Sequence, residues 1–156
     1  MKPAKAKKKR VGAGSVLRTQ YAALPWRINN GRVEIMLVTS RDTKRWVIPK
    51  GWPMKGRKPH IAAAIEAVQE AGLVGKMDKA KLGDFRYEKR LDSGATVDCR
   101  VEVFSLRVQS QRKKWREKKQ RATRWFECAV AAGLVEEPEL RDLMLGFCEA
   151  LSQQKS

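Results

Sequence analysis

The residues best suited to chemistry lie close together near the middle of the chain. Glu66, Gln69 and Glu70 occupy positions i, i+3 and i+4 of an alanine-rich segment. On a helix these positions project from one face, about one turn apart. Two carboxylates at this spacing can share a hard cation such as Mg²⁺, which takes oxygen ligands and keeps several waters. The same pattern occurs on helix faces that meet only solvent, so the pair alone does not assign a site.

The segment that carries these side chains is predicted to be a helix from Pro59 to Gly72. Pro59 suits the first helical turn, because the N–H that it lacks would be unpaired there, and Gly72 suits the position just after the last turn. The alanines between them favour a helix and offer a small apolar surface for packing on a sheet. A loop rich in glycine, proline and lysine at residues 50–58 precedes the helix, so the acidic side chains are expected beneath several cations.

The remaining chain reads as strands, two hairpins and a second long helix. Strands are expected at residues 16–28 with an interruption at Pro25, and at 33–38, 46–48, 82–90, 96–108 and 122–126. A short helix is expected at 127–132 and a longer one from Pro138. This mixture predicts an α/β or α+β domain with a mixed sheet. Residues 1–14 are expected to be a basic flexible lead, 15–152 a single domain and 153–156 a tail.

Positive charge is concentrated in two segments. The 156 residues include 34 Lys and Arg against 17 Asp and Glu, a net charge of +17. Residues 1–10 carry +6 and residues 107–124 carry +8, so the rest of the chain carries only +3. Such runs attract nucleic acid, anionic lipid or a highly phosphorylated small molecule, or they serve as solvated, solubilising segments. Trp115, within the second run, suits either stacking on a base or anchoring the loop.

Composition excludes several classes of protein. A hydrophobic fraction of 42% is enough for a core, and no run approaches the roughly 20 apolar residues of a membrane span. The basic N-terminus is not followed by the apolar segment of a secretory signal. The three cysteines, Cys99, Cys128 and Cys148, cannot all pair, lie far apart and lack metal-site spacing. We therefore expect a reduced, cytoplasmic protein with no membrane partner; the oligomeric state is not predicted.

The residues from Gly51 to Leu73 follow a longer and more specific pattern. They read Gly51-x5-Arg57-x7-Ile65-Glu66-Ala67-x-Gln69-Glu70-x-Gly72-Leu73. Without a gap, this spacing resembles the Nudix box, G-x5-E-x7-R-E-U-x-E-E-x-G-U, in which U is aliphatic. The flanking residues 40–51 and 121–126 resemble the diphosphoinositol polyphosphate phosphohydrolase branch of that superfamily.

The resemblance implies a Nudix-type α/β/α sandwich, with a mixed sheet, that hydrolyses a pyrophosphate bond using Mg²⁺, with Mn²⁺ as a possible substitute. Glu66 and Glu70 would hold the metal together with a backbone carbonyl of Lys50 or Gly51, and Gln69 would be an auxiliary ligand or would orient water. The cations expected to bind substrate phosphates are Arg18, Arg41, Lys44, Lys50, Lys55 and Lys89, with Arg90 as an alternative to Lys89.

Three positions depart from the box. Arg57 and Ile65 stand where the family has a Glu–Arg ion pair, and losing both partners leaves no unpaired buried charge. We expect the loop to be held instead by packing of Trp52, Pro53 and Ile65.

The third departure is Gln69, which replaces a glutamate. An amide keeps an oxygen for coordination but carries no charge and cannot act as a base. A task that needs a carboxylate would then pass to Glu66, Glu70 or a residue outside the box, of which Glu117 is the candidate.

Three functions therefore compete. The leading hypothesis is hydrolysis of a nucleoside diphosphate-linked or polyphosphorylated small molecule, of the inositol pyrophosphate or dinucleoside polyphosphate type. The second is a catalytically impaired domain that binds a phosphorylated ligand or RNA. The third is hydrolysis at RNA 5′ ends, with the basic segments and Trp115 binding the RNA.

Overall fold

The computed structural model describes residues 10–11 and 15–155. Residues 10–11 form β1 (Arg10–Val11), which pairs antiparallel with β2 (Ser15–Val16). The rest of the predicted basic lead, residues 1–9 and 12–14, lies outside the described residues.

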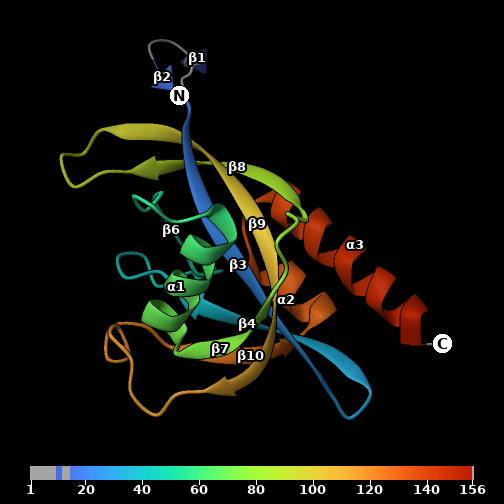
Figure 1. The fold of residues 1–156 in the computed structure, drawn as a ribbon. Coiled ribbons are helices and arrows are strands. Elements are labelled where there is room, and N and C mark those ends of the chain that lie inside the picture. Colours follow the sequence, from blue (N-terminus) through green and yellow to red (C-terminus); the bar gives the residue numbers. More distant parts are fainter. Residues whose placement is uncertain (1–9, 12–14, 156) are drawn as a thin grey trace.

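A mixed sheet forms the centre of the described chain (Figure 1). Its main strands run in the order β10 (Thr123–Glu127), β4 (Arg32–Thr39), β3 (Arg18–Asn29), β9 (Thr96–Gln111) and β7 (Leu73–Met77). β3 and β9 are parallel, whereas the other pairs are antiparallel. Three further strands pair with it: β5 (Trp46–Val47) on β4, β6 (Lys50–Gly51) on β3 and β8 (Gly83–Arg90) on β9.

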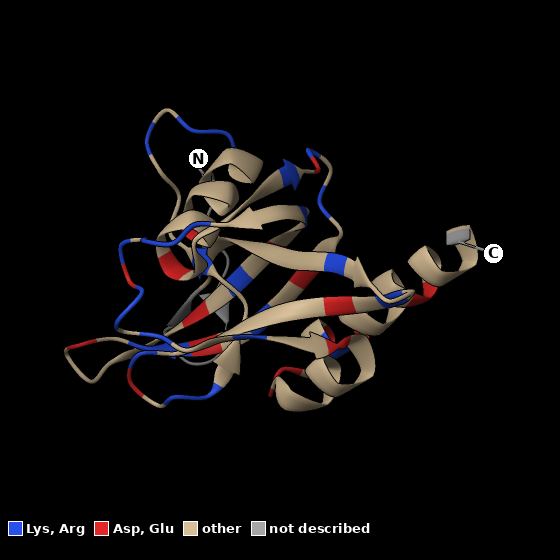
Figure 2. Ribbon diagram, turned by 90° about the horizontal axis from the view of Figure 1, so that it is seen from below, with Lys and Arg blue, Asp and Glu red and all other residues tan. Residues whose placement is uncertain are grey.

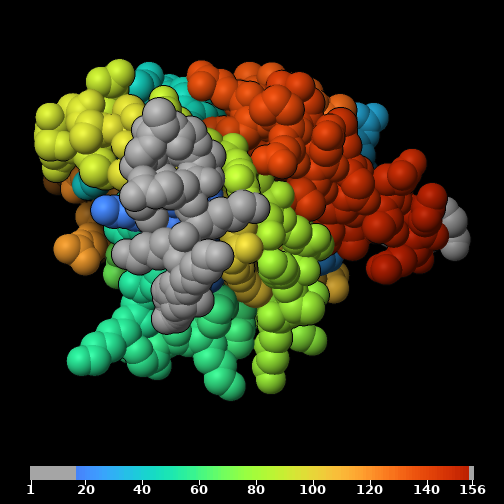
Figure 3. All heavy atoms as spheres, turned by 90° about the horizontal axis from the view of Figure 1, so that it is seen from above, coloured from blue at the N-terminus to red at the C-terminus, as the bar shows by residue number. Residues whose placement is uncertain are grey.

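Helices cover both faces of this sheet. α1 (Pro59–Ala71) packs on one face, while α2 (Cys128–Leu134) and α3 (Pro138–Lys155) pack on the other. Figure 3 shows the loop before α1 (green) and the helices α2 and α3 (orange to red) on opposite sides of the molecule. The predicted α/β/α sandwich with a mixed sheet is confirmed.

Alternation along β3 produces the two cores. Ala22, Leu24 and Trp26 belong to the core beneath α2 and α3, whereas Ala23 belongs to the core beneath α1. Successive side chains of a strand point to opposite faces, so a strand that is buried on both sides is apolar at nearly every position.

The predicted helix over the acidic residues is α1, with the expected boundaries. Pro59 occupies its first turn, and Gly72 ends it in the left-handed conformation with φ 68°, its N–H donating to the carbonyls of Ala67 and Val68. Ala63, Ala67 and Ala71 are buried against the sheet. Small side chains on this face bring the helix close to β3.

Three of the differences from the expected strands and helices concern β3, β7 and α3. β3 continues through Pro25, whose missing N–H falls between the pairing with β6, which ends at Ala22, and the pairing with β4, which begins at Trp26. β7 was not predicted, because its residues pair with the far end of an unusually long β9. α3 continues to Lys155, so residues 153–155 are helical.

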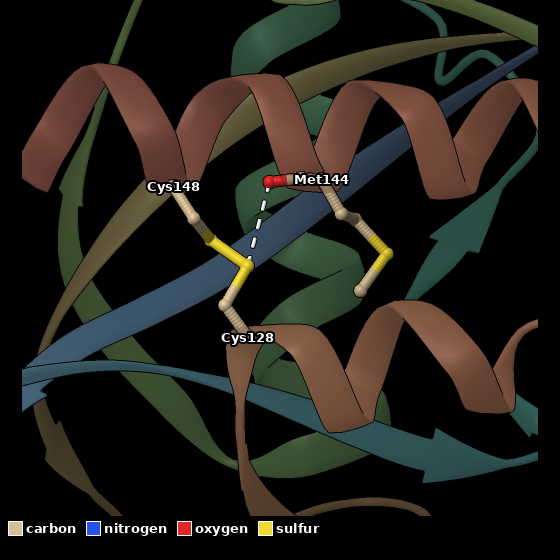
Figure 4. The surroundings of a disulfide bond; sticks show 3 residues. All are labelled: Cys128, Met144 and Cys148. Carbon is tan, nitrogen blue, oxygen red and sulfur yellow. Dashed lines mark hydrogen bonds between the residues drawn. A yellow bond between two sulfur atoms is a disulfide. The ribbon is translucent and has the colours of Figure 1, made fainter.

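Two of the three cysteines are paired, which corrects the prediction of reduced thiols. Cys128 at the start of α2 and Cys148 in α3 form a disulfide, with their Cα atoms 6.5 Å apart (Figure 4). The two residues are 20 positions apart in sequence, and only the packing of α2 against α3 brings them together. Cys99 is free and buried.

No helix among the described residues is long and apolar enough to cross a membrane.

Candidate functional site

Glu66 lies directly against the β6 strand. A Cβ atom on Gly51 would collide with the carboxylate of Glu66, at its Oε2 and Cδ atoms. Gly51 is held there by the pairing of β6 with Tyr21 and Ala22 of β3. The structure therefore brings together three of the predicted metal-site residues, Lys50, Gly51 and Glu66, and the absence of a side chain at residue 51 allows the close contact.

Glu70 is the most buried acidic residue of α1, with 5% of its surface exposed. Burial raises the pKa of Glu70 to about 8, against the lowering effect of Arg121 and Lys50. Burial also raises the pKa of Glu66, and a side-chain hydrogen bond to Glu70 offsets part of that increase. The two carboxyl groups thus form one partly desolvated acidic pair.

Gln69 contacts the loop formed by residues 112–122, which we call the basic loop. Its backbone carbonyl accepts a hydrogen bond of 2.9 Å from the N–H of Glu117. The negative charge of Glu117 contributes to raising the pKa values of Glu66 and Glu70. Glu117, the candidate outside the box, therefore lies beside the acidic pair.

Arg121 joins the basic loop to the acidic pair. Its Nε lies 2.7 Å from Glu117 Oε1, its Nη2 lies 3.7 Å from Glu70 Oε2, and its Nη1 donates to the carbonyl oxygen of Thr39 at 3.0 Å. Its side chain is only 11% exposed. This arginine was not among the predicted site residues, although it begins the flank whose resemblance was noted.

The donor set suits a hard cation. The two acidic side chains offer carboxylate oxygens, and the repulsion between these neighbouring, partly desolvated carboxylates is one that a divalent cation would relieve. Within residues 10–11 and 15–155, no three His, Cys, Asp or Glu side chains form a complete metal-binding group. Mg²⁺ commonly uses only one or two carboxylates and completes its shell with waters and substrate phosphates, so Glu66 and Glu70 fit it.

A cleft of about 260 Å³ adjoins Glu70. Three of the predicted phosphate-binding cations, Arg41, Lys50 and Lys89, line it. The other three, Arg18, Lys44 and Lys55, do not. The lining residues that were not predicted as site residues, apart from the alternative Arg90, include Gln20, Arg45, Tyr87 and Arg121.

Lys50, Tyr87 and Gln20 form one wall of the cleft. The Lys50 Nζ lies 4.9 Å from the centre of the Tyr87 ring, and the Tyr87 hydroxyl donates to Gln20 Oε1 at 2.6 Å. Removal from water lowers the pKa of Lys50 to about 8, an effect that Glu70 and Glu137 oppose. Because β3, β6 and β8 supply these three residues, only the sheet brings them together.

Cations continue from the cleft onto the surrounding loops. Arg41 donates to Gln120 Oε1 at 3.3 Å, which connects the cleft to the basic loop. In Figure 2, Lys and Arg gather along the loops at the left edge of the molecule, while the helices are mostly free of them. The cleft therefore combines an acidic pair with a cationic surround, an arrangement that can hold a cation and the phosphates bound to it.

Trp115 anchors the basic loop to the end of α1. A Cβ atom on Gly72 would collide with its ring, and the Arg112 N–H donates to the Gly72 carbonyl at 2.8 Å. Of the two interpretations of Trp115, the geometry favours the loop anchor over base stacking.

The loop before α1 differs from the prediction at two of the three residues expected to pack there. Trp52 and Pro53 are exposed, whereas Ile65 is half-buried. A turn closed by the Arg57 N–H to the Met54 carbonyl, with Gly56 at φ 75°, shapes the loop.

Comparisons with known proteins agree with this architecture. No protein-family model matches the chain. The chain is 27% identical over 106 residues to Nudix hydrolase 12, mitochondrial, of Arabidopsis thaliana. The matched region covers 66% of this chain and 52% of that relative. It spans between about half and two thirds of the length of the curated relatives that it matches.

Solved structures share the fold at low sequence identity. A C. elegans Ap4A hydrolase binary complex superposes with a TM-score of 0.65 at 18% identity, covering 87% of this chain and 98% of the other. The NUDIX domain of Shewanella oneidensis NrtR complexed with ADP ribose gives a TM-score of 0.57 at 10% identity, covering 92% and 96%.

The architecture is thus the Nudix fold. The resemblance to the Nudix superfamily, predicted from the spacing between Gly51 and Leu73, is confirmed by the curated relatives and the structural neighbours together. None of them singles out the diphosphoinositol polyphosphate phosphohydrolase branch.

Proposed function

We propose that this protein is a metal-dependent pyrophosphohydrolase of the Nudix type. The observation that carries the proposal is the acidic pair of Glu66 and Glu70, set against Gly51 and adjoining a cleft lined by cations. The similarity to curated Nudix hydrolases supports the same class of reaction.

In this proposal Glu66 and Glu70 hold Mg²⁺ or Mn²⁺, together with a backbone carbonyl of Lys50 or Gly51. When bound, the cation would offset negative charge on the substrate phosphates and favour attack by water. Gln69 has no charge to contribute, and its amide oxygen would serve as an auxiliary metal ligand or would orient water.

The substrate class is a small molecule with several phosphates. Arg41, Lys50 and Lys89 in the cleft would neutralise them, and the structural neighbours include an Ap4A hydrolase and a domain bound to ADP ribose. A dinucleoside polyphosphate or a nucleoside diphosphate-linked compound is the preferred class, with inositol pyrophosphates next.

The test is phosphate release, after phosphatase treatment where the product requires it, from a panel of these three classes. Each substrate is assayed with Mg²⁺, with Mn²⁺ and with EDTA. The proposal predicts turnover that requires a divalent cation. Equal turnover in EDTA, or none with any of the three classes, would refute it.

Gln69 favours a second candidate, a domain that binds its phosphorylated ligand without hydrolysing it. A Gln69→Glu variant separates the two: the enzyme hypothesis predicts measurable turnover in the wild type, whereas the binding hypothesis predicts turnover only in the variant. RNA is the weaker ligand for this candidate, because Trp115 is engaged with Gly72.

A cytoplasmic location stays a prediction. The Cys128–Cys148 disulfide is of a kind that persists mainly in oxidising compartments, so the location is best tested on the intact cell.

A further inference from the structure

Arg45, one of the cations that line the cleft, has a backbone fixed by two hydrogen bonds. Both its carbonyl and its N–H are paired with Ser40: the Ser40 N–H donates to the Arg45 carbonyl at 2.8 Å, and the Arg45 N–H donates to Ser40 Oγ at 3.1 Å. Arg45 is thus set at the base of the 40–45 turn, immediately before β5.

The side chain of Arg45 is held by acids from the opposite end of the chain. Its Nη2 lies 2.8 Å from Glu137 Oε2, and its Nε lies 3.7 Å from Glu136 Oε1. Glu137 is 8% exposed and directly precedes α3. The disulfide links α3 to α2 (Figure 4), and this link restrains the helix that follows the Glu137 carboxylate bound to Arg45.

One of the three guanidinium nitrogens of Arg45, Nη1, is buried and makes no hydrogen bond among the described residues, and Glu137 Oε1 is likewise buried and unpaired. The pair therefore keeps unused hydrogen-bonding capacity on both partners, and Arg45 lines the cleft. Buried donors in proteins are almost always paired, with protein, water or a ligand. An arginine fork that binds a carboxylate on one side presents its other N–H groups in a geometry suited to a phosphate.

Three neighbouring cations of the cleft already have partners within the protein. Arg121 uses its three nitrogens on Thr39, Glu117 and Glu70. Arg41 donates to Gln120, and Lys50 lies against the Tyr87 ring. Arg45 is the arginine of the cleft that combines a fixed position with an unpaired donor.

We propose that Arg45 binds a phosphate group of the substrate in the cleft and that Glu137 is its positioning residue. The proposal rests on the proposed function for the chemical class of the ligand. It adds a residue pair that joins the 40–45 turn to the start of α3.

The test measures binding of inorganic pyrophosphate by calorimetry in EDTA, so that neither metal nor turnover contributes. Arg45→Gln should raise the dissociation constant roughly tenfold or more, because a hydrogen bond to a charged group is lost. Arg45→Lys should recover only part of the affinity, since an ammonium cannot serve Glu137 and a phosphate as a fork. Glu137→Gln, which keeps the arginine but loosens it, should raise the constant several-fold.

Removing Arg45 alone leaves Glu137 as an unpaired buried charge, which can destabilise the fold. The double variant Arg45→Gln/Glu137→Gln removes both charges and should fold, as checked by thermal unfolding. It should still bind pyrophosphate as weakly as Arg45→Gln. The matched control is Arg27→Gln, which breaks another Arg–Glu pair, with Glu34, outside the cleft and should bind as the wild type does.

Wild-type affinity in the double variant would overturn the proposal, because Arg45 would then serve only to stabilise the chain. Failure of the wild type to bind pyrophosphate would overturn it as well. Both results are independent of the hydrolysis panel. If the wild type hydrolyses a substrate but Arg45 does not contribute to pyrophosphate binding, the proposed function stands and this inference fails. If Arg45 contributes to binding but no substrate is hydrolysed, only the proposed function is refuted.

Discussion

At the scale of single residues, close approach rather than charge decides where the acidic pair lies. Glu66 reaches β6 because Gly51 has no side chain, and Glu70 lies deep enough for burial to raise its pKa to about 8. The spacing of the glutamates along α1 was enough to predict that they share a face. Their distance from Gly51 depends on the pairing of β6 with β3, which no local pattern contains.

Gly51→Ala should therefore separate activity from stability. The added methyl group meets the flexible end of Glu66, which can turn away, so the free energy of unfolding should change by less than about 1 kcal/mol. The displaced carboxylate should lower kcat by roughly a hundredfold, the effect expected of a misplacement of about 1 Å. Turnover and thermal unfolding of the same preparation provide the check.

Gly146→Ala is the matched control, since its Cβ would meet open space within α3. It should retain full activity and gain up to about 1 kcal/mol from better helix propensity. Wild-type kcat in Gly51→Ala would show that the contact between Gly51 and Glu66 is irrelevant to catalysis.

At the scale of elements, the parts predicted well are those whose signals are local. α1 carries its proline, its alanines and its terminal glycine within its own sequence, so both ends were predicted. β7 has no such signal and exists because β9 is long enough to pair with it. The cleft residues Arg45, Tyr87 and Arg121 come from three separate elements, and only their assembly identifies them.

The basic loop is expected to behave as a fixed element because Trp115 packs on Gly72. Trp115→Ala should release it, and each 1.4 kcal/mol of lost local stability raises the open population about tenfold. Cleavage by trypsin among the lysines and arginines of residues 112–119 should accelerate accordingly, as measured by mass spectrometry of the fragments.

Trp52→Ala, at an exposed tryptophan, is the control and should leave cleavage of the basic loop unchanged. If Trp115→Ala also left it unchanged, the anchor interpretation would fail and the base-stacking interpretation would regain its place.

The disulfide between α2 and α3 should add measurable stability. Closing a loop of this length, with the cysteines 20 residues apart, is worth about 3 kcal/mol in the chain-entropy treatment. Reduction by dithiothreitol should lower the Tm by roughly 10 °C. A Cys128→Ser/Cys148→Ser variant should start at the lower Tm and not respond to the reductant, and an equal response in both proteins would contradict a structural disulfide.

At the scale of the whole molecule, the two hydrophobic cores and the candidate site occupy different parts of the fold. The two cores lie on opposite faces of the sheet, while the acidic pair and the cleft lie where β6, α1 and the basic loop meet. The two basic segments behind the charge of +17 made a phosphorylated ligand one of several expectations, beside nucleic acid, anionic lipid and a solubilising role. That expectation did not say which cations share a cleft, because Arg18, Lys44 and Lys55 depend on loop and strand positions that only the assembled sheet defines.

The most direct test of the account is the Mg²⁺ dependence of turnover in the wild type, Glu66→Gln and Glu70→Gln proteins on the best substrate of the panel. Both replacements are close in shape and remove the charge that would hold the cation. The account predicts that turnover in the wild type saturates with Mg²⁺ and that each variant loses at least about a hundredfold in kcat, while thermal unfolding shows both variants folded. Turnover that survives in either folded variant would contradict the claim that Glu66 and Glu70 form the catalytic metal site.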